Sequence, residues 1–478
     1  MAAGPPPGHH GRVTLRHAMS AIVRGCSGGQ PPSGDGSLSP LRHRNQSPPS
    51  CGAPWSGPDR TLAAALLWLL AALVYMGNGR YTSAPDTTPS ELLPISLLTE
   101  GNLDFDEFTR PGEPLPYFYA SRNDRVVSFY PVLPGLLNVP VHVLAKAYGL
   151  DLYRVRYALA KTTAATVVAL SVAFMFLALT RVCTRRETAV MMALVYGFGT
   201  HSWSVASQGL WQHGPSLLLL SIAVWLLLSP GRLCTPLAGL FLGLAVFNRP
   251  SNLVFALPLA LYMATQRRQM LGWFLACAAG PAIAMAWYSH SYWGSVFALG
   301  QGHRFDGTHG IHHTRLLAPL LPGLAGLLFS PNRGLFVFTP VFIIAVPWWI
   351  AALWQRRSEA VWRYLASGAV LHLLLYGTWS VWWGGWSFGY RLLIEMLPVL
   401  TLFLAIAWDR WVSLASWRIG LFSVLTVASV YVQALGALAY PTGWNAAMDI
   451  DRNPSRCWNL RDTELGRCQA KLFRLEKR

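Results

Sequence analysis

TLAAALLWLLAALVYM (Thr61–Met76) leads into DTTPSELLPISLLTEGNLDFDEF (Asp86–Phe108), and these two stretches set the architecture of the chain. The first is the earliest strongly apolar segment, and the basic residues before it predict a membrane span whose N-terminus is cytoplasmic. The second concentrates acids in a chain that otherwise has few: Asp86, Glu91, Glu100, Asp104, Asp106 and Glu107. Carboxylates gathered in a loop just outside a membrane span indicate a functional site.

The composition is that of a polytopic membrane protein. Of the 478 residues, 53% are hydrophobic and 12% charged, and the mean hydropathy is +0.34. The net charge of +17 does not indicate a nucleic-acid partner, because most Arg residues lie in short loops between apolar runs, where they orient helices and meet membrane lipids. The seven Cys lack metal-type spacing, and only Cys457 and Cys468 form a plausible disulfide pair, provided that their segment is outside the cytoplasm.

The chain divides into three parts. Residues 1–60 are rich in Pro, Gly, Ser and Arg and predict a disordered, basic, cytoplasmic extension. Residues 61–440 predict the membrane domain, and 441–478 an external tail by the parity of the spans. The membrane domain has a first external loop, 78–152, with interfacial helices over Pro89–Thr99 and Pro131–Tyr148. A second long external loop covers 293–335.

The membrane domain is predicted to be all-α, with about eleven spans in total. After the first, they lie near 154–180, 188–206, 211–228, 236–248, 251–265, 270–292, 335–354, 361–380, 391–408 and 418–440. The Arg-bearing loops between them fall alternately on the side of the N-terminus, as the positive-inside rule requires. Asn248, Arg249 and Pro250 interrupt 236–265, so this segment is either two short spans or a re-entrant pair.

The polar clusters of this topology all fall on the external side. Besides the acids, the candidate residues are Tyr130, Arg249, His303, Arg304, Arg333, Arg391 and Glu395. An Arg side chain binds phosphate oxygens bidentately and keeps its charge, so Arg333 and Arg391 are candidates for binding a phosphate group. A carboxylate can take a proton from a hydroxyl or an amine, and Asp86 is the candidate for that role.

Structural explanations exist for several of these residues. Asp104, Asp106 and Glu107 are spaced like a solvated turn, and Asp86 precedes an apolar helix, where an N-cap or turn role would explain it. Arg391 and Glu395 are four residues apart at the start of a helix, so a same-face ion pair accounts for both.

Two further polar segments have alternative interpretations. The His residues of HRFDGTHGIHH (His303, His309, His312 and His313) could bind a divalent metal together with Asp306, but their spacing matches no strong signature, and a polar Gly-containing loop explains them equally. The sequence therefore indicates no particular cofactor, and a divalent metal is possible but not indicated. The polar start of the span at Gln208–His213 is explained by interfacial anchoring, with contact to a sugar or an acceptor as the alternative.

Several motifs together resemble a known family. They are Asp86-Thr87 with LLPISLLTEGNLDFDEF (92–108), SFYPVLPGLLNVPV (128–141), GLWQHGP (209–215), NRPSN (248–252), SPNRGLFVFTP (330–340) and WWGGWSFGYRLLIEMLP (382–398). Their order resembles the GT-C membrane glycosyltransferases of the family 39 type, which include protein O-mannosyltransferases and lipid A aminoarabinose transferase. The match is nearest to an uncharacterised bacterial branch and extends from about residue 61 to the C-terminus.

The resemblance implies a transferase that uses a polyprenyl-phosphate-linked sugar. Asp86 takes the place of the family's catalytic acid, although Thr87 stands where a second acid often follows it. Phe129-Tyr130-Pro131 stands where the aminoarabinose transferases have Lys-Pro-Pro, so Arg333 or Arg391 would replace that donor-phosphate contact. Asp104 and Asp106 would shape the loop or orient the acceptor.

The resulting expectation is an inverting glycosyltransferase in the plasma (inner) membrane, with its active site outside the cytoplasm and a lipid, glycan or protein acceptor. Two other functions remain open, namely a transporter or flippase of lipid-linked saccharides and a non-catalytic membrane scaffold. A transporter would need charged groups in the middle of its spans. A scaffold would leave Asp86 far from Arg333 and Arg391.

Overall fold

The computed structural model describes residues 56–82, 84–110, 112–298, 300, 318–354, 360–440 and 443–473, all within one compact unit. The predictions for residues 1–55, and those for His303, Arg304 and the His-rich segment, lie outside the described residues.

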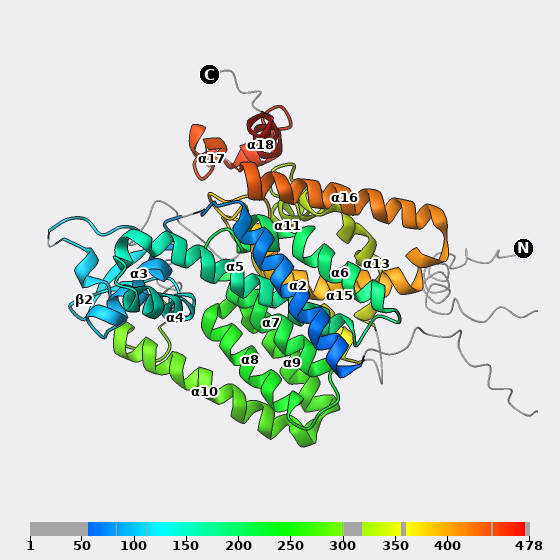
Figure 1. The fold of residues 1–478 in the computed structure, drawn as a ribbon, viewed down its shortest axis with the longest axis horizontal. Coiled ribbons are helices and arrows are strands. Elements are labelled where there is room, and N and C mark those ends of the chain that lie inside the picture. The colour runs from blue at the N-terminus through cyan, green and yellow to red at the C-terminus, as the bar shows by residue number, and fades with distance from the viewer. Residues whose placement is uncertain are drawn as a thin grey trace, which may run out of the picture. The chain divides into compact units, whose positions relative to one another are not determined.

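Every predicted span contains at least one helix, and the span predicted at 335–354 contains two short ones (Figure 1). The helices are α2 (Gly57–Gly77), α5 (Leu152–Leu179), α6 (Arg186–Phe198), α7 (His213–Leu228), α8 (Cys234–Asn248), α9 (Leu253–Gln266), α10 (Arg268–Trp293), α12 (Leu335–Phe338), α13 (Val346–Ala352), α14 (Ala360–Gly377), α15 (Leu397–Arg410) and α16 (Ser416–Ala439). Short 3-10 stretches precede α9, α13 and α15. One apolar helix, α11 (Leu320–Phe329), was not expected, because it lies within the predicted second external loop.

Five helices of the described segments are long and apolar enough to cross a membrane. They are Gly57–Gly77, Leu152–Leu179, Arg268–Trp293, Arg391–Leu414 and Ser416–Ala439. Four shorter apolar helices accompany them, at His213–Leu228, Cys234–Asn248, Leu320–Phe329 and Pro340–Ala352. The protein is therefore a helical multi-pass membrane protein, while the number of eleven spans remains a prediction.

Five of the helices pack side by side in a row. Helix α2 packs on α5, α5 on α7, α7 on α8, and α8 on α10 (Figure 1). Helix α8 packs mainly on α10, and α9 packs mainly on α14. The segment 236–265 therefore folds as two separately packed helices. The segment Arg391–Leu414, which contains α15, is the most buried of the five candidate spans.

The first helix begins earlier than the apolar pattern predicts. Ser56 is its N-cap and accepts a hydrogen bond from the backbone N–H of Asp59 at 3.1 Å. Because Pro58 fits the first helical turn without needing a donor, the helix starts at Gly57 instead of Thr61.

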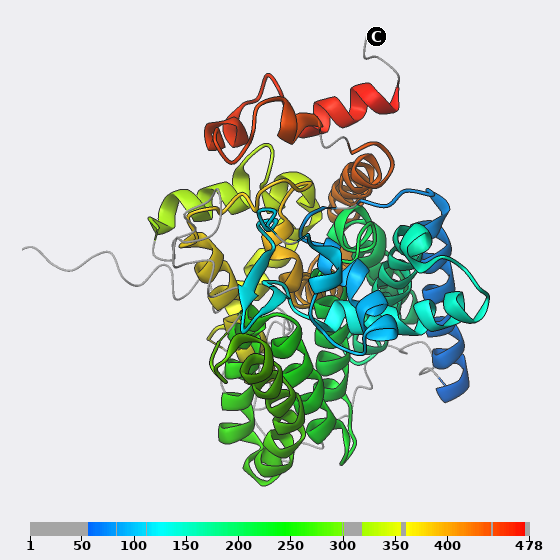
Figure 2. The ribbon, with the colours of Figure 1, turned by 90° about the vertical axis from the view of Figure 1, so that its left-hand side faces the viewer.

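The predicted first loop is a folded subdomain, which Figure 2 views from its own side. It contains α3 (Thr88–Thr99), a 3-10 turn (Asp106–Phe108), β1 (Tyr119–Arg122), β2 (Arg125–Ser128) and α4 (Leu133–Ala147). The two helices confirm the expected elements, and a separate apolar core that includes Phe105, Val127, Phe129 and Trp293 holds them together.

The hairpin in this loop was not expected. Its strands pair antiparallel with Tyr119 opposite Ser128 and Arg122 opposite Arg125. Asn123 and Asp124 both have positive φ, at 51° and 57°, which is the conformation of a two-residue type I′ turn. Asn and Asp tolerate this region better than other non-glycine residues.

The C-terminal segment is also folded. α17 (Gly443–Ala447), a 3-10 turn (Pro454–Trp458) and α18 (Glu464–Leu472) follow α16, and α18 packs on it (Figure 1). The suggested disulfide is wrong in this structure, because Cys457 and Cys468 are buried free thiols. Burial raises the pKa of the Cys457 thiol to about 11, so this thiol stays protonated at neutral pH.

Candidate functional site

Asp86 lies in the turn before α3, beside residues from distant parts of the chain. Its Oδ2 is 2.9 Å from Arg391 Nη1, and its Oδ1 accepts hydrogen bonds from the hydroxyls of Tyr117, at 2.9 Å, and Tyr130, at 2.5 Å. The side chains of Asp86 and Arg391 are 19% and 13% exposed. The N-cap of α3 is Thr87, so an N-cap role for Asp86 is excluded. The structure thus brings together Asp86, Tyr130 and Arg391 in a site that solvent can reach.

Arg391 is held in place on two further sides. Its Nη2 donates to the carbonyl of Gly384 at 2.6 Å, and its guanidinium lies over the ring of Trp211, 4.8 Å from the centroid. Gly384 and Gly385 have φ of +73° and +69°, and this double left-handed turn is open to glycine but strained for other residues. The Nε of Arg391 is buried and makes no hydrogen bond within the described residues, so one donor of the guanidinium remains unused.

The same-face ion pair between Arg391 and Glu395, which was the structural explanation offered for both residues, does not form. Residues Arg391–Met396 form a 3-10 helix, and the α-helix begins only at Leu397. With three residues per turn, side chains four positions apart do not share a face. Arg391 therefore points to Asp86, and Glu395 points into the bundle.

Glu395 is the centre of a buried polar network beside this site. Its Oε1 is 2.6 Å from Arg249 Nη1 and 2.8 Å from His213 Nδ1, and Arg249 Nη2 donates to the Tyr376 hydroxyl at 2.6 Å. Its Oε2 lies 3.7 Å from His372 Nε2 and makes no hydrogen bond in the described part of the chain. These side chains are all nearly inaccessible to solvent, so the network braces the bundle from within.

The polar start of α7 is buried, which corrects the interfacial-anchoring interpretation. Gln208, Trp211 and His213 are 2%, 5% and 2% exposed. Trp211 supports Arg391 and His213 binds Glu395. One short segment therefore connects the Arg391 site with the buried network.

Arg333 is placed away from solvent, at 1% exposure. Its guanidinium forms a salt bridge with Glu464 at 3.0 Å and donates to Asn445 Oδ1 at 2.6 Å and to the Gly385 carbonyl at 3.3 Å. A phosphate at Arg333 would have to displace Glu464. The contacts favour a supporting role, since Arg333 and Arg391 bind consecutive carbonyls of the Gly384–Gly385 turn.

The acids at the end of the opening stretch support the loop. Asp106 Oδ1 accepts the backbone N–H of Val126 at 2.5 Å and so ties the 3-10 turn to the hairpin. Asp104 is 2% exposed, which makes the solvated-turn interpretation wrong for it, and its Oδ2 lies 3.9 Å from Arg125. Burial and the neighbouring Asp106 raise the pKa of Asp104, and Arg125 opposes this only in part. Burial also raises the pKa of Glu107.

The raised pKa of Asp104 predicts a pH-dependent stability. The folded loop binds the proton more tightly than the unfolded chain does, so this contribution to stability is present at low pH and is lost as the pH rises through the raised pKa. We expect Asp104→Asn to raise the unfolding temperature by about 1–2 °C at pH 8 and to have little effect at pH 4.5. Thermal unfolding of the purified protein at both pH values measures this, with the exposed Glu113→Gln as the control. An equal shift at both pH values would contradict it.

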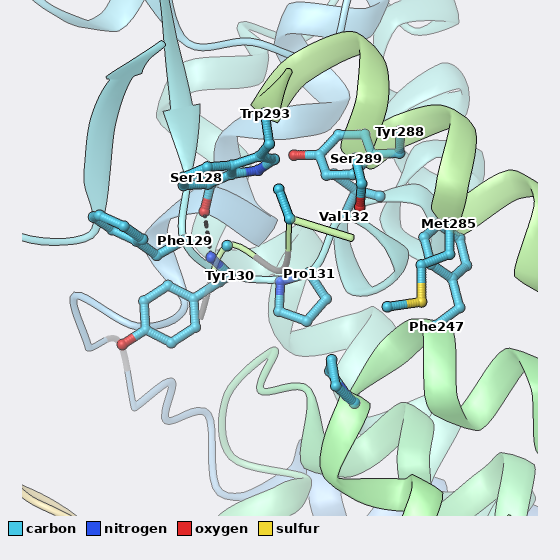
Figure 3. A pocket seen from close by; sticks show the side chains of 13 residues that line it. Ser128, Phe129, Tyr130, Pro131, Val132, Phe247, Met285, Tyr288, Ser289 and Trp293 are labelled. Atoms are coloured by element: carbon cyan, nitrogen blue, oxygen red, sulfur yellow. Dashed lines mark hydrogen bonds between the residues drawn. The ribbon is translucent and has the colours of Figure 1, made fainter. Parts of the chain in front are cut away.

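An apolar recess adjoins the site on the side of Tyr130 (Figure 3). It encloses about 420 Å³ including its open mouth. Figure 3 shows Pro131 between Tyr130 and Met285, with Trp293 of α10 above them and the Tyr130 hydroxyl turned away from Met285. Tyr130 therefore contributes to the wall of the recess and also binds Asp86.

The question of a metal site stays open. The described residues contain no group of three or more His, Cys, Asp or Glu that could hold a metal ion. The segment with His303 and Arg304 lies outside them.

Sequence reasoning missed several residues of these two clusters. Tyr117 lies in a Pro-rich stretch that gives no signal for a contact with Asp86. His372 and Tyr376 are polar residues on α14, an otherwise apolar span, which is a usable signal because such residues inside a membrane domain are seldom without a partner.

Comparison with known proteins gives distant structural neighbours only. No protein-family model and no curated protein matches the chain. The oligosaccharyltransferase of Archaeoglobus fulgidus, crystallised with Zn and sulfate, is similar at a TM-score of 0.49 and 13% identity, over 82% of this chain and 57% of that one. The same enzyme tethered to an acceptor peptide gives 0.48 and 13%, over 83% and 58%. Its complex with an inhibitory peptide and a dolichol-phosphate gives 0.47 and 12%, over 84% and 60%.

This chain thus spans less than two thirds of the length of those oligosaccharyltransferases. A likeness this distant says nothing about the sugar, the acceptor or the catalytic residue of this chain.

Proposed function

We propose that the protein is an integral membrane glycosyltransferase that moves a sugar from a polyprenyl-phosphate donor to an acceptor on the extracytoplasmic side. The observation that supports this best is the contact between Asp86 and Arg391, which places a carboxylate and a guanidinium side by side in a partly exposed site. A transfer of this kind needs both groups, a base for the acceptor and a cation for the leaving phosphate. The motif resemblance points to the same reaction and the same base.

In the proposed reaction, Asp86 takes the proton from the acceptor hydroxyl or amine. The freed lone pair forms a bond to the anomeric carbon of the sugar, the bond from that carbon to the phosphate oxygen breaks, and the configuration inverts. The electron pair leaves with the phosphate, whose negative charge Arg391 stabilises. Tyr117 and Tyr130 donate hydrogen bonds to the carboxylate and orient it.

The resting contacts suggest how the donor prepares the base. Arg391 Nη1 is hydrogen-bonded to Asp86 Oδ2 at 2.9 Å, so Oδ2 already has a partner before the donor binds. A phosphate offers several charged oxygens to a guanidinium that has an unused Nε, and it competes with the single carboxylate contact. Donor binding would then draw Arg391 toward the phosphate and free Asp86 to accept a proton.

The orientation and the partners follow from the same proposal. In this proposal the protein lies in the plasma (inner) membrane. The basic segment before α2 favours a cytoplasmic N-terminus, and the first loop then lies outside the cytoplasm. The acceptor is a lipid, a glycan or a protein.

The direct test is turnover by the purified protein in proteoliposomes that contain defined polyprenyl-phosphate sugars. Formation of a glycosylated acceptor together with free polyprenyl phosphate supports the proposal. Movement of the intact donor across the bilayer without covalent transfer would instead identify a flippase. The absence of both activities with the whole donor panel would favour a scaffold.

Arg391→Lys tests the role of the guanidinium fork. Lysine keeps the positive charge but cannot bind two phosphate oxygens in one plane. We expect kcat/KM for the donor to fall by about 10–100-fold, which corresponds to the loss of one charge-assisted hydrogen bond. Steady-state kinetics over a range of donor concentrations measures it, and Arg110→Lys, at an exposed position of the first loop, is the matched control. Unchanged donor kinetics would remove Arg391 from the mechanism.

A further inference from the structure

Two further cations, Arg80 and Lys161, lie close to each other in the bundle. Helix α2 ends there against α5 and near the end of α16 (Figure 1). Arg80 follows α2, and its Nη2 donates to the carbonyl of Tyr440 at 2.9 Å. Its Nη1 is buried and makes no hydrogen bond within the described residues. Lys161 of α5 is 7% exposed, and its Nζ donates to the Ser207 carbonyl at 3.1 Å and to Gln208 Oε1 at 3.0 Å.

The acceptors of these two cations are all uncharged. They are two backbone carbonyls and one side-chain amide oxygen, and the part of the chain that the structure describes gives neither cation an ion pair with a carboxylate. Asn78, two residues before Arg80, and Lys161 both donate to Gln208 Oε1, so the two basic residues belong to one cluster. Two neighbouring cations in a water-poor place are costly unless an anion compensates them.

We propose that Arg80 and Lys161 form a binding site for a phosphate group, separate from the one assigned to Arg391. The two charges match those of a phosphate monoester, which carries close to two negative charges at neutral pH. Arg80 supplies an unused Nη1 donor, and Lys161 supplies a compact ammonium group with several donors. Because Arg80 is only half-buried, a ligand can reach its side chain from the surface.

Neighbouring side chains hold the site in place. Asn78 donates to Gln208 Oε1 at 2.6 Å and accepts the backbone N–H of Arg80 at 3.2 Å. Gln208 therefore bridges the Asn78 end of α2 and Lys161. Trp211, which supports Arg391, lies three residues after Gln208. The segment from Gln208 to Trp211 therefore connects this phosphate site with Arg391.

The phosphate could belong to a lipid headgroup or be free in solution, and binding experiments separate the two. The full chain in nanodiscs is titrated with farnesyl phosphate, inorganic phosphate and farnesol, and heats of binding are recorded for the wild type and for Arg391→Gln, in which the other phosphate contact is removed. Similar affinities for inorganic phosphate and farnesyl phosphate identify a free anion. Clearly tighter binding of farnesyl phosphate identifies a lipid headgroup.

Lys161→Met and Arg80→Gln are the test variants, and Arg110→Gln is the matched surface control. In the Arg391→Gln background, we expect each test variant to bind the phosphate probe about 10–100-fold more weakly, and the control to bind it normally. Lys161→Met also removes a buried charge, so the ligand-free variant should unfold at the same temperature as the wild type or higher.

Two results would overturn the proposal. One is unchanged phosphate binding when Lys161→Met or Arg80→Gln is added to the Arg391→Gln variant and the protein still folds. The other is equal binding of farnesol and farnesyl phosphate, which would show that the phosphate is not recognised. In the Arg391→Gln background Asp86→Asn should leave phosphate binding unchanged, so failure of the proposed transfer reaction and failure of this site are told apart.

Discussion

Asp86→Asn lowers the rate of sugar transfer by about 10²–10⁴-fold, the usual contribution of a general base. Asparagine has nearly the same shape as aspartate but cannot accept the acceptor's proton, and it also removes the charge that faces Arg391 at 2.9 Å. Because the side chain of Asp86 is partly exposed, the loss of the pair should cost little stability. The measurement is kcat in proteoliposomes with saturating donor, together with the unfolding temperature.

The matched control is Asp124→Asn. Asp124 lies in the same loop, is exposed and has a positive φ that asparagine also tolerates. Asp124→Asn should therefore keep both activity and stability. Wild-type kcat in a folded Asp86→Asn protein would remove Asp86 from the reaction, and a loss of activity that follows a large drop in unfolding temperature would assign Asp86 a structural role instead.

The helices were predictable because the membrane leaves the chain few choices. A long apolar segment must satisfy its own backbone hydrogen bonds in lipid, and a helix does so locally. Each predicted span accordingly contains a helix, and the two helices of the first loop appear close to their expected limits. The hairpin was missed because its strands are only four residues long and carry no clear alternation, although Asn123-Asp124 was a usable turn signal.

The candidate site was predictable in part. Asp86 and Arg391 were both selected, but their contact joins residues 305 positions apart, and no local pattern encodes such a pairing. The expectation for Arg391 and Glu395 failed because it assumed α-helical spacing where the chain forms a 3-10 turn. Arg333 was selected for its charge, and only the fold reveals that Glu464 already occupies it.

Arg249→Met should lower the free energy of unfolding by about 3–5 kcal/mol, the largest stability change that we expect in the protein. The change leaves Glu395 as a buried carboxylate that has lost its 2.6 Å contact with the guanidinium. Denaturation in mixed micelles with increasing SDS measures the effect. A folded variant with unchanged stability would show that water or another cation reaches Glu395.

The double variant Arg249→Met with Glu395→Leu separates stability from positioning. With both charges gone, the interior is apolar again, so much of the lost stability should return. Arg391 lies on the same 3-10 turn as Glu395, and Trp211 beneath it lies two residues before His213. If the network only stabilised the bundle, the double variant would regain transfer together with stability. If it also sets the position of Arg391, the double variant is stable but keeps a raised KM for the donor, and this second outcome is the one that the geometry favours.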